Sequence, residues 1–345
     1  MIAKVIAVLA AVGVLIAAVV FLFSNRGSSG ISFLPGIPDE PAVCPLSGNK
    51  PSRDALLQRP AVAVKVENNP AAYPLSGLQK AEVVYEELVE GGITRFMALY
   101  QCADAKQVGP VRSARIVDPA IMMPATKILA DAGANGIVRK ALADRGIVSI
   151  DEKSAGDAMR RIPRPGQSFE HTLYGNTAAL RRLGAEQYDQ PPPSDMFHFG
   201  PLPPGAKKAN HVRLSFSNAD TIQYDWSGRK WLRSDFGAPL TMENGGQIAV
   251  DNVLVEKHLV NFSKRLTDVV GAPSTVIADA TGSGEAFLFR NGRVIVGTWV
   301  RSSTDESVVF KKRSGAEMPL ARGKTWIELV PNKKGDVKGW VSYTK

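Results

Sequence analysis

A Gly-Gly pair at residues 91–92 separates two β-rich runs and is the short feature that most constrains the fold of this chain. The runs read AEVVYEELVE and ITRFMALYQ, and a type I′ turn between them needs positive φ at both central residues, which glycine adopts readily. The pattern predicts a β-hairpin with a two-residue loop. In that register Glu86 and Glu90 share one face with Arg95, and Glu87 points away.

The charged face of this hairpin has two interpretations, and the sequence leaves both open. In the structural interpretation, Arg95 neutralises Glu86 and Glu90 across the strands and sets their register. In the functional interpretation, one of these glutamates faces a cleft as a general acid or base, with a pKa set by Arg95 and by burial. Enzymes that cleave glycosidic bonds commonly use two spaced carboxylic acids, which Glu86 and Glu90 would provide.

Basic and aromatic residues downstream extend the candidate site. Arg112 and Arg115 lie three residues apart in VGPVRSAR, and this spacing places both guanidinium groups on one face of a helical turn. Arginine binds carboxylate or phosphate groups bidentately, although both side chains could equally pair with the hairpin glutamates. In FEHTLYGNT, His171 is a candidate acid, base or ligand donor, with a structural hydrogen bond as the alternative. The catalytic candidates are Glu90 and His171, and the ligand-binding candidates are Glu86, Arg95, Arg112, Arg115 and Tyr174.

The two cysteines, Cys44 and Cys102, are a disulfide candidate. In an oxidising compartment, a bond between them would close a long loop and contribute on the order of 4 kcal/mol to stability. Two separate buried thiols are the alternative. Neither cysteine has the spacing of a metal site, and the histidines form no metal-binding motif. We therefore predict no metal and no cofactor.

An apolar run near the amino terminus predicts the compartment. All 19 residues from Val5 to Phe23 are apolar or glycine, close to the roughly 20 that span a bilayer core. No small-residue cleavage site follows, so the pattern predicts a transmembrane helix retained as a signal anchor. Lys4 before the run favours a cytoplasmic amino end. We expect a single-pass protein of the cell membrane with its C-terminal ectodomain outside the cytoplasm; a buried core helix is the alternative.

Stretches rich in proline, glycine and serine divide the rest of the chain. The predicted parts are a transmembrane anchor (1–26), a linker (27–44), a first domain (45–188), a Pro-rich linker (189–207) and a second domain (208–345). The predicted fold class is α+β, with an α/β-type first domain around a central hairpin and mixed sheet, and a mostly antiparallel β second domain. Asn176 is the predicted cap of a helix from Thr177 to Leu183.

The net charge of +9 bears on partners. Residues 200–345 hold 21 Lys and Arg against 14 Asp and Glu, so the second domain is basic. Solvated turns account for most such clusters. The functional alternative is attraction to an anionic cell-wall polymer or lipid headgroups, since the sequence has no nucleic-acid-binding motif.

The motifs of both domains resemble the YerB-like family of bacterial envelope proteins, whose two domains have no known function. The resemblance spans about residues 44–335. It rests on RPAVAVKVENNPAAYPLSGLQKAEVVYEELVEGGITRFMALYQ, VGPVRSAR, FEHTLYGNT, VIVGTWVRSS and GKTWIELVP. It implies an extracytoplasmic, membrane-tethered protein linked to the cell wall, with an α/β first domain and a β-rich second domain. It also implies a pocket formed by Glu90, Arg95, Arg112, Arg115 and His171.

Two departures from the family pattern are visible. Family members are often lipoproteins, whereas this sequence shows no acylation cysteine. Where members tend to have Arg-Pro after the first strand, this chain has Tyr73-Pro74, so no charge is available there.

These patterns predict a membrane-anchored extracytoplasmic protein that binds a cell-wall-associated ligand, such as a peptidoglycan fragment, and supports envelope assembly or remodelling. Two alternatives stay open: an enzyme that cleaves glycan strands with a glutamate acid or base, and a non-catalytic adaptor for wall-synthesis proteins. The expected partners are a cell-wall polymer, wall-synthesis or remodelling proteins, and the membrane through the amino-terminal helix. Nucleic acid is not an expected partner.

Overall fold

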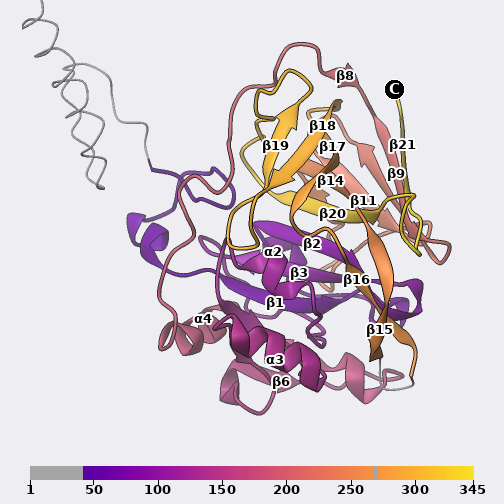
Figure 1. Ribbon diagram of the computed structural model, residues 1–345. Helices are drawn as coiled ribbons and strands as arrows, with labels where there is room; N and C mark the ends of the chain where they lie inside the picture. The colour runs from indigo at the N-terminus through magenta and orange to yellow at the C-terminus, as the bar shows by residue number, and fades with distance from the viewer. Residues whose placement is uncertain (1–41, 268–270) are drawn as a thin grey trace, which may run out of the picture. The chain divides into compact units, whose positions relative to one another are not determined.

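The largest element of the fold is an eleven-stranded mixed sheet (Figure 1). The computed structural model describes residues 42–267 and 271–345. Ten strands of this sheet are, in spatial order, β19 (Val309–Lys312), β18 (Arg293–Arg301), β17 (Gly282–Arg290), β14 (Asn252–His258), β20 (Thr325–Pro331), β2 (Val83–Leu88), β3 (Thr94–Tyr100), β1 (Val62–Glu67), β4 (Ile128–Ala130) and β5 (Val148–Ile150). The eleventh, β8 (Lys207–Lys208), pairs with β18.

Strand β20 joins the two halves of the large sheet. It lies between β2 and β14 and pairs with both in parallel. Toward one edge, the strands come from residues 62–150, and toward the other edge they come from residues 252–312 and from β8. One hydrogen-bonded sheet therefore contains strands from both predicted domains.

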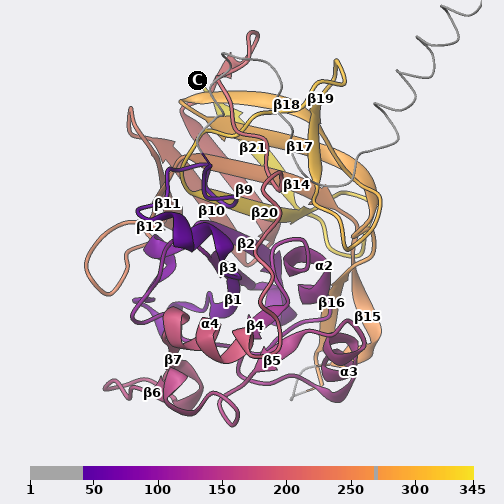
Figure 2. The same cartoon turned by 90° about the vertical axis from the view of Figure 1, so that its left-hand side faces the viewer.

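A six-stranded sheet packs against the large one (Figure 2). Its strands are β12 (Ala238–Pro239), β11 (Trp231–Asp235), β10 (Asp220–Trp226), β9 (His211–Ser217) and β21 (Trp340–Thr344), with β13 (Ala249–Val250) paired to β11. Leu214 and Tyr224 from this sheet share a hydrophobic cluster with Val84 and Phe96 from the large sheet. Two ribbons complete the strands: β15 (Val260–Thr267) with β16 (Pro273–Ile277), and β6 (Met159–Arg161) with β7 (Leu173–Gly175).

The helices are short and lie on both faces of the large sheet. Helices α2 (Asp118–Met122) and α3 (Gly136–Asp144) pack with one set of core residues, and α4 (Thr177–Ala185) packs with the other. The predicted cap of α4 is confirmed, because Asn176 accepts the N–H of Ala179 at 2.9 Å. The described residues also form six 3-10 turns: Asp54–Gln58, Pro70–Ala72, Leu78–Lys80, Glu90–Gly92, Gly156–Ala158 and Phe169–His171.

The predicted fold class is wrong, because β-strands far outweigh helices in the described residues, which form 21 strands and only three short α-helices. The first domain was expected to be of α/β type, but its helices are few and short, and its strands continue the β-structure of the second domain. Sequence periodicity identified the strands, but it could not show that both halves share one sheet. The two halves share one sheet because β20 forms backbone hydrogen bonds with β2 on one side and with β14 on the other.

The predicted transmembrane anchor is also corrected. Within residues 42–267 and 271–345, no helix is long and apolar enough to cross a membrane. The apolar run at residues 5–23 lies outside the described residues. A signal anchor is therefore no part of the function proposed below.

The predicted hairpin is present, but its loop length is wrong. Strands β2 and β3 pair Glu87 with Arg95, and the loop consists of three residues, Glu90–Gly92. Both loop glycines have positive φ, at 73° and 76°. Because side chains alternate along a strand, a slip of one residue exchanges the faces. Glu87 therefore shares the face of Arg95, and Glu86 lies on the opposite face.

On that opposite face, Glu86 belongs to a buried ion network between the two sheets. Arg233 of β11 places Nη1 2.7 Å from Glu86 Oε2 and Nε 2.7 Å from Asp235 Oδ1, and Nη1 is also 3.1 Å from Glu328 Oε1. All four side chains are fully buried. The guanidinium carbon lies 4.6 Å from the ring centroid of Trp326. Burial raises the pKa of Glu86 well above its usual value, although Arg233 opposes this shift.

Candidate functional site

A cavity of about 840 Å³ brings together four of the residues predicted from the sequence. Glu90, Arg95, Arg112 and Arg115 all line it. The hairpin supplies the first two, and the segment between β3 and α2 supplies the other two. Strand β16 closes one wall with Ser274. A polar cavity of this volume is within the range of small-molecule sites.

Glu90 is held in this cavity as a carboxylate. Arg115 binds it with Nε at 3.0 Å and with Nη2, and the Ser274 hydroxyl donates a further hydrogen bond to it. Burial raises the pKa of Glu90, but Arg115 and Ser274 outweigh burial, so the pKa lies below its usual value. An ionised carboxylate that is engaged on both oxygens is poorly suited to donate a proton.

Arg95 is the buried cation of the cavity. Its residue is 5% exposed, and its Nη1 donates to the carbonyl oxygen of Ser113 at 3.0 Å. Burial, together with the charges of Arg115 and Arg112, lowers the pKa of Arg95 to about 9. The group remains charged at neutral pH. Among the described residues, no carboxylate lies within ion-pair distance of its guanidinium.

Arg112 is connected to His171 through Glu67. Glu67 Oε1 lies 3.3 Å from Nε of Arg112, and Glu67 Oε2 lies 2.7 Å from Nδ1 of His171. Arg112 also donates to the backbone oxygen of Glu170 at 3.0 Å. His171 has an 8% exposed side chain and does not line the cavity. We therefore assign His171 to the support of Arg112 rather than to contact with a ligand.

Sequence reasoning missed Glu67 and Ser274. The signal for Glu67 was available, because strict alternation in VAVKVE places Lys65 and Glu67 on one face of β1. That strand pairs with β3 so that Glu67 lies opposite Arg95. Ser274 carried no such signal, since it reaches the hairpin loop from 184 residues along the chain.

Two predicted ligand-binding residues lie elsewhere. Glu86 is 0% exposed and is bound by Arg233, so it does not face the cavity. Tyr174 lines a separate cavity of about 410 Å³, where its hydroxyl accepts a hydrogen bond from Arg164. Burial raises the pKa of Tyr174 to about 12.

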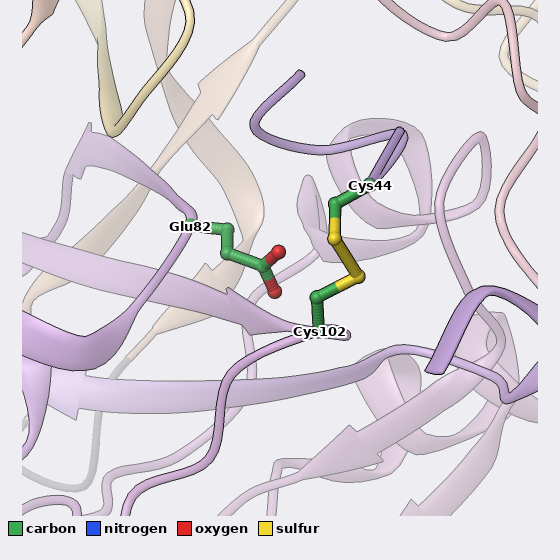
Figure 3. A group of neighbouring side chains, drawn as sticks. All are labelled: Cys44, Glu82 and Cys102. Atoms are coloured by element: carbon green, nitrogen blue, oxygen red, sulfur yellow. A yellow bond between two sulfur atoms is a disulfide. The ribbon is translucent and has the colours of Figure 1, made fainter. Parts of the chain in front are cut away.

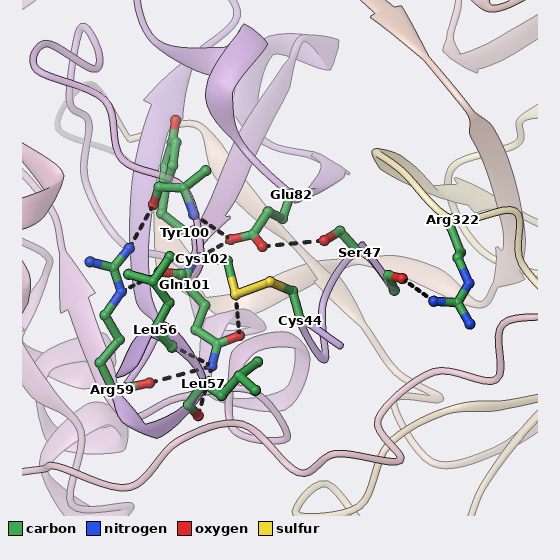
Figure 4. Close-up of a disulfide and its surroundings, with 12 residues drawn as sticks. Cys44, Ser47, Leu56, Leu57, Arg59, Glu82, Tyr100, Gln101, Cys102 and Arg322 are labelled. Carbon is green, nitrogen blue, oxygen red and sulfur yellow. Dashed lines mark hydrogen bonds between the residues drawn. A yellow bond between two sulfur atoms is a disulfide. The ribbon is translucent and has the colours of Figure 1, made fainter. Parts of the chain in front are cut away.

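Cys44 and Cys102 form a disulfide (Figure 3). With Glu82, they are a group of described residues whose ligand atoms lie close enough together to hold a metal ion. Their sulfur atoms are bonded to each other, so neither is a thiolate available for a metal. Glu82 is instead occupied by the backbone N–H of Gln101 at 2.6 Å and by the hydroxyl of Ser47 at 3.4 Å (Figure 4). The group is structural.

A second polar cluster surrounds His258 of β14. Its Nε2 lies 3.0 Å from Glu256 and its Nδ1 lies 3.1 Å from Asp279, and its ring stacks on Trp299 with a centroid distance of 4.5 Å. Burial lowers the pKa of His258, but hydrogen bonds to Asp279 and Glu256 outweigh burial and raise the pKa to about 9. The adjoining cavity has only about 20 Å³, room for about one water molecule. This cluster is therefore a structural ion pair.

The pKa of His258 predicts a loss of stability at alkaline pH. The folded pKa of about 9 lies above the ordinary 6.5, so the contribution is complete below pH 6.5 and is lost as the pH rises through about 9. We expect a loss of about 3 kcal/mol in the free energy of unfolding between pH 6 and 9.5. Urea denaturation at several pH values measures it. His258→Gln should flatten this dependence, whereas His211→Gln at an exposed site should retain it; an unchanged slope in His258→Gln would contradict the assignment.

Comparisons with known proteins identify the family. The N-terminal domain model of the proteins of unknown function DUF3048 matches residues 46–190, and the C-terminal domain model matches residues 211–327. "Putative lipoprotein YerB" of Bacillus subtilis (strain 168) is 29% identical over 305 residues, which are 84% of this chain and 86% of that protein. The crystal structure of YerB protein from Bacillus subtilis matches with a TM-score of 0.71 at 26% identity, covering 87% of this chain and 99% of that one.

These matches confirm the resemblance drawn from the sequence motifs. The relative is named a lipoprotein, a class that is held on a membrane by attached lipid. That name, with the described helices, is in conflict with the predicted signal anchor. The chain belongs to the YerB-like family of two-domain DUF3048 proteins.

Proposed function

We propose that this protein is an envelope-associated binding protein whose cavity takes a ligand from the cell wall, such as a peptidoglycan fragment. The observation that carries the proposal is the cavity of about 840 Å³ with Glu90, Arg95, Arg112 and Arg115 on its wall. The similarity to a lipoprotein supports an extracytoplasmic, envelope-associated location. Ligands offered by that location include peptidoglycan fragments, which present carboxylate, amide and hydroxyl groups that match a polar wall of this kind.

The geometry favours binding over glycan cleavage. A cleaving enzyme needs a carboxylic acid that can donate a proton to the leaving group. Glu90 is fixed as a carboxylate by Arg115 and Ser274, and its pKa lies below the usual value. Glu86 is buried on the opposite face of the sheet. Neither glutamate is therefore placed to act as the acid, and His171 supports Arg112 instead.

Muropeptides test the proposal directly. We expect the purified full chain to bind a muropeptide mixture from muramidase-digested peptidoglycan, measured by calorimetry. Arg112→Gln should weaken binding about tenfold or more, because it removes a charged donor from the cavity wall. Arg229→Gln, at an exposed turn, should bind like wild type. Absence of binding to wild type, or equal binding by Arg112→Gln, would argue against this cavity as the site. New reducing ends released by wild type but not by Glu90→Gln would favour the enzyme instead.

A further inference from the structure

We infer that the cavity recognises its ligand through a carboxylate group that binds to Arg95. This inference rests on the proposed function and specifies which chemical group of the wall-derived ligand the protein binds. Arg95 is then the residue that determines the ligand specificity of the cavity. Arg112, Arg115 and Glu90 form the wall around it.

Arg112 and Arg115 beside Arg95 already have anionic partners. Arg115 binds Glu90 through two guanidinium nitrogens, and Arg112 lies 3.3 Å from Glu67. Among the described residues, in contrast, the only hydrogen-bond acceptor of the Arg95 guanidinium is the carbonyl oxygen of Ser113, at 3.0 Å. A guanidinium group has five N–H donors, so most of its hydrogen-bonding capacity is open toward the cavity.

Two acids on the neighbouring strands lie opposite Arg95. Glu87 of β2 and Glu67 of β1 both lie opposite Arg95 in register. Glu87 is bound by Lys65, and Glu67 is bound by His171 and Arg112. Both adjacent carboxylates are therefore engaged by other cations. The sheet places a buried arginine between two acids without giving it either as an ion-pair partner among the described residues.

The burial of Arg95 without an ion pair costs free energy. A buried charge without a partner is unfavourable, and a ligand anion would supply the missing compensation. Burial and the charges of Arg115 and Arg112 lower the pKa of Arg95 to about 9, which agrees with a buried positive charge that lacks an ion-pair partner among the described residues. Because Arg95 is buried and its guanidinium is bound to the Ser113 carbonyl oxygen, little side-chain freedom would be lost on binding.

The shape of the Arg95 guanidinium favours a carboxylate over a phosphate. Asp151, Glu152, Arg139 and Lys153 also line the cavity, and these two acids and two cations together favour neither group. Arg95 is a buried cation without an ion pair among the described residues, and it matches one negative charge. The planar fork of a guanidinium also matches the two oxygens of a carboxylate. A carboxylate at a peptide terminus or on a sugar acid has this chemistry.

A pair of matched probes tests the inference in the full chain. The first probe is a muropeptide with a free carboxylate at the end of its stem peptide, and the second is the same muropeptide with that carboxylate converted to an amide. We expect wild type to bind the acid about 10- to 100-fold more tightly than the amide. Arg95→Gln should bind both probes equally and weakly, and Arg95→Lys should keep part of the preference. Arg229→Gln should behave like wild type.

The outcomes separate the inference from the proposed function. If wild type binds acid and amide equally, carboxylate recognition is wrong, while the cavity remains a binding site. If wild type binds neither probe, both are overturned. If inorganic phosphate displaces the acid probe at a concentration where acetate does not, a phosphate ligand replaces the carboxylate. The wild-type comparison needs no variant, and thermal melting shows whether Arg95→Gln remains folded.

Discussion

Replacing Arg233 with methionine is expected to lower the free energy of unfolding by about 3–5 kcal/mol, the range found when one partner of a buried ion pair is removed. The guanidinium has no exposed surface and faces Glu86, Asp235 and Glu328, which would remain buried without their cation. Urea denaturation followed by tryptophan fluorescence measures the loss. Arg213→Met is the matched control, because Arg213 is an exposed arginine on strand β9 of the same sheet, and its loss should stay below about 1 kcal/mol.

A second variant shows whether the loss comes from the uncompensated acids. The double variant Arg233→Met with Glu86→Gln should be less destabilised than Arg233→Met alone, because one of the three buried carboxyl groups left without the cation is removed. A loss below about 1 kcal/mol for Arg233→Met would show that the network does not stabilise the junction of the two sheets. Equal losses for the single and double variants would point to packing rather than charge.

Reducing the bond between Cys44 and Cys102 is expected to lower the free energy of unfolding by about 4 kcal/mol in the chain-entropy model. The two residues are 58 positions apart, so the bond restricts a long loop in the unfolded chain. The same denaturation experiment with and without dithiothreitol measures the change. The double variant Cys44→Ala, Cys102→Ala should show the reduced stability and should not respond to dithiothreitol. A shift below about 1 kcal/mol in wild type would contradict the prediction.

Local patterns predicted local structure well. The Asn176 cap predicted the start of α4, and alternation predicted β1 and the hairpin strands. The loop length of the hairpin was wrong by one residue, since Gly-Gly is compatible with a two-residue loop and with the three-residue loop Glu90–Gly92. That single residue decided which glutamate faces Arg95, because strand faces alternate.

Contacts between distant segments were beyond the reach of these patterns. The cavity residues Glu90, Arg95, Arg112 and Arg115 are close in the chain, so their grouping could be predicted. Their charge states could not, because they depend on partners supplied by other strands. No local sequence pattern identifies Ser274 as the hydrogen-bond donor to Glu90. Nor does one identify Arg233 as the ion-pair partner of Glu86 on the opposite face of the sheet.

The place of β20 in the large sheet has a consequence for how the chain is made. This strand begins at Thr325, yet it lies at the centre of the sheet, between β2 and β14. A ribosome delivers it after the other ten strands of this sheet, and so does an export channel that is entered amino end first. Until then β2 and β14 each have an unpaired edge, the feature that invites pairing with other chains. The two halves of the large sheet therefore join only when β20 pairs with β2 and β14. Until that step, both open edges need protection from pairing with other chains.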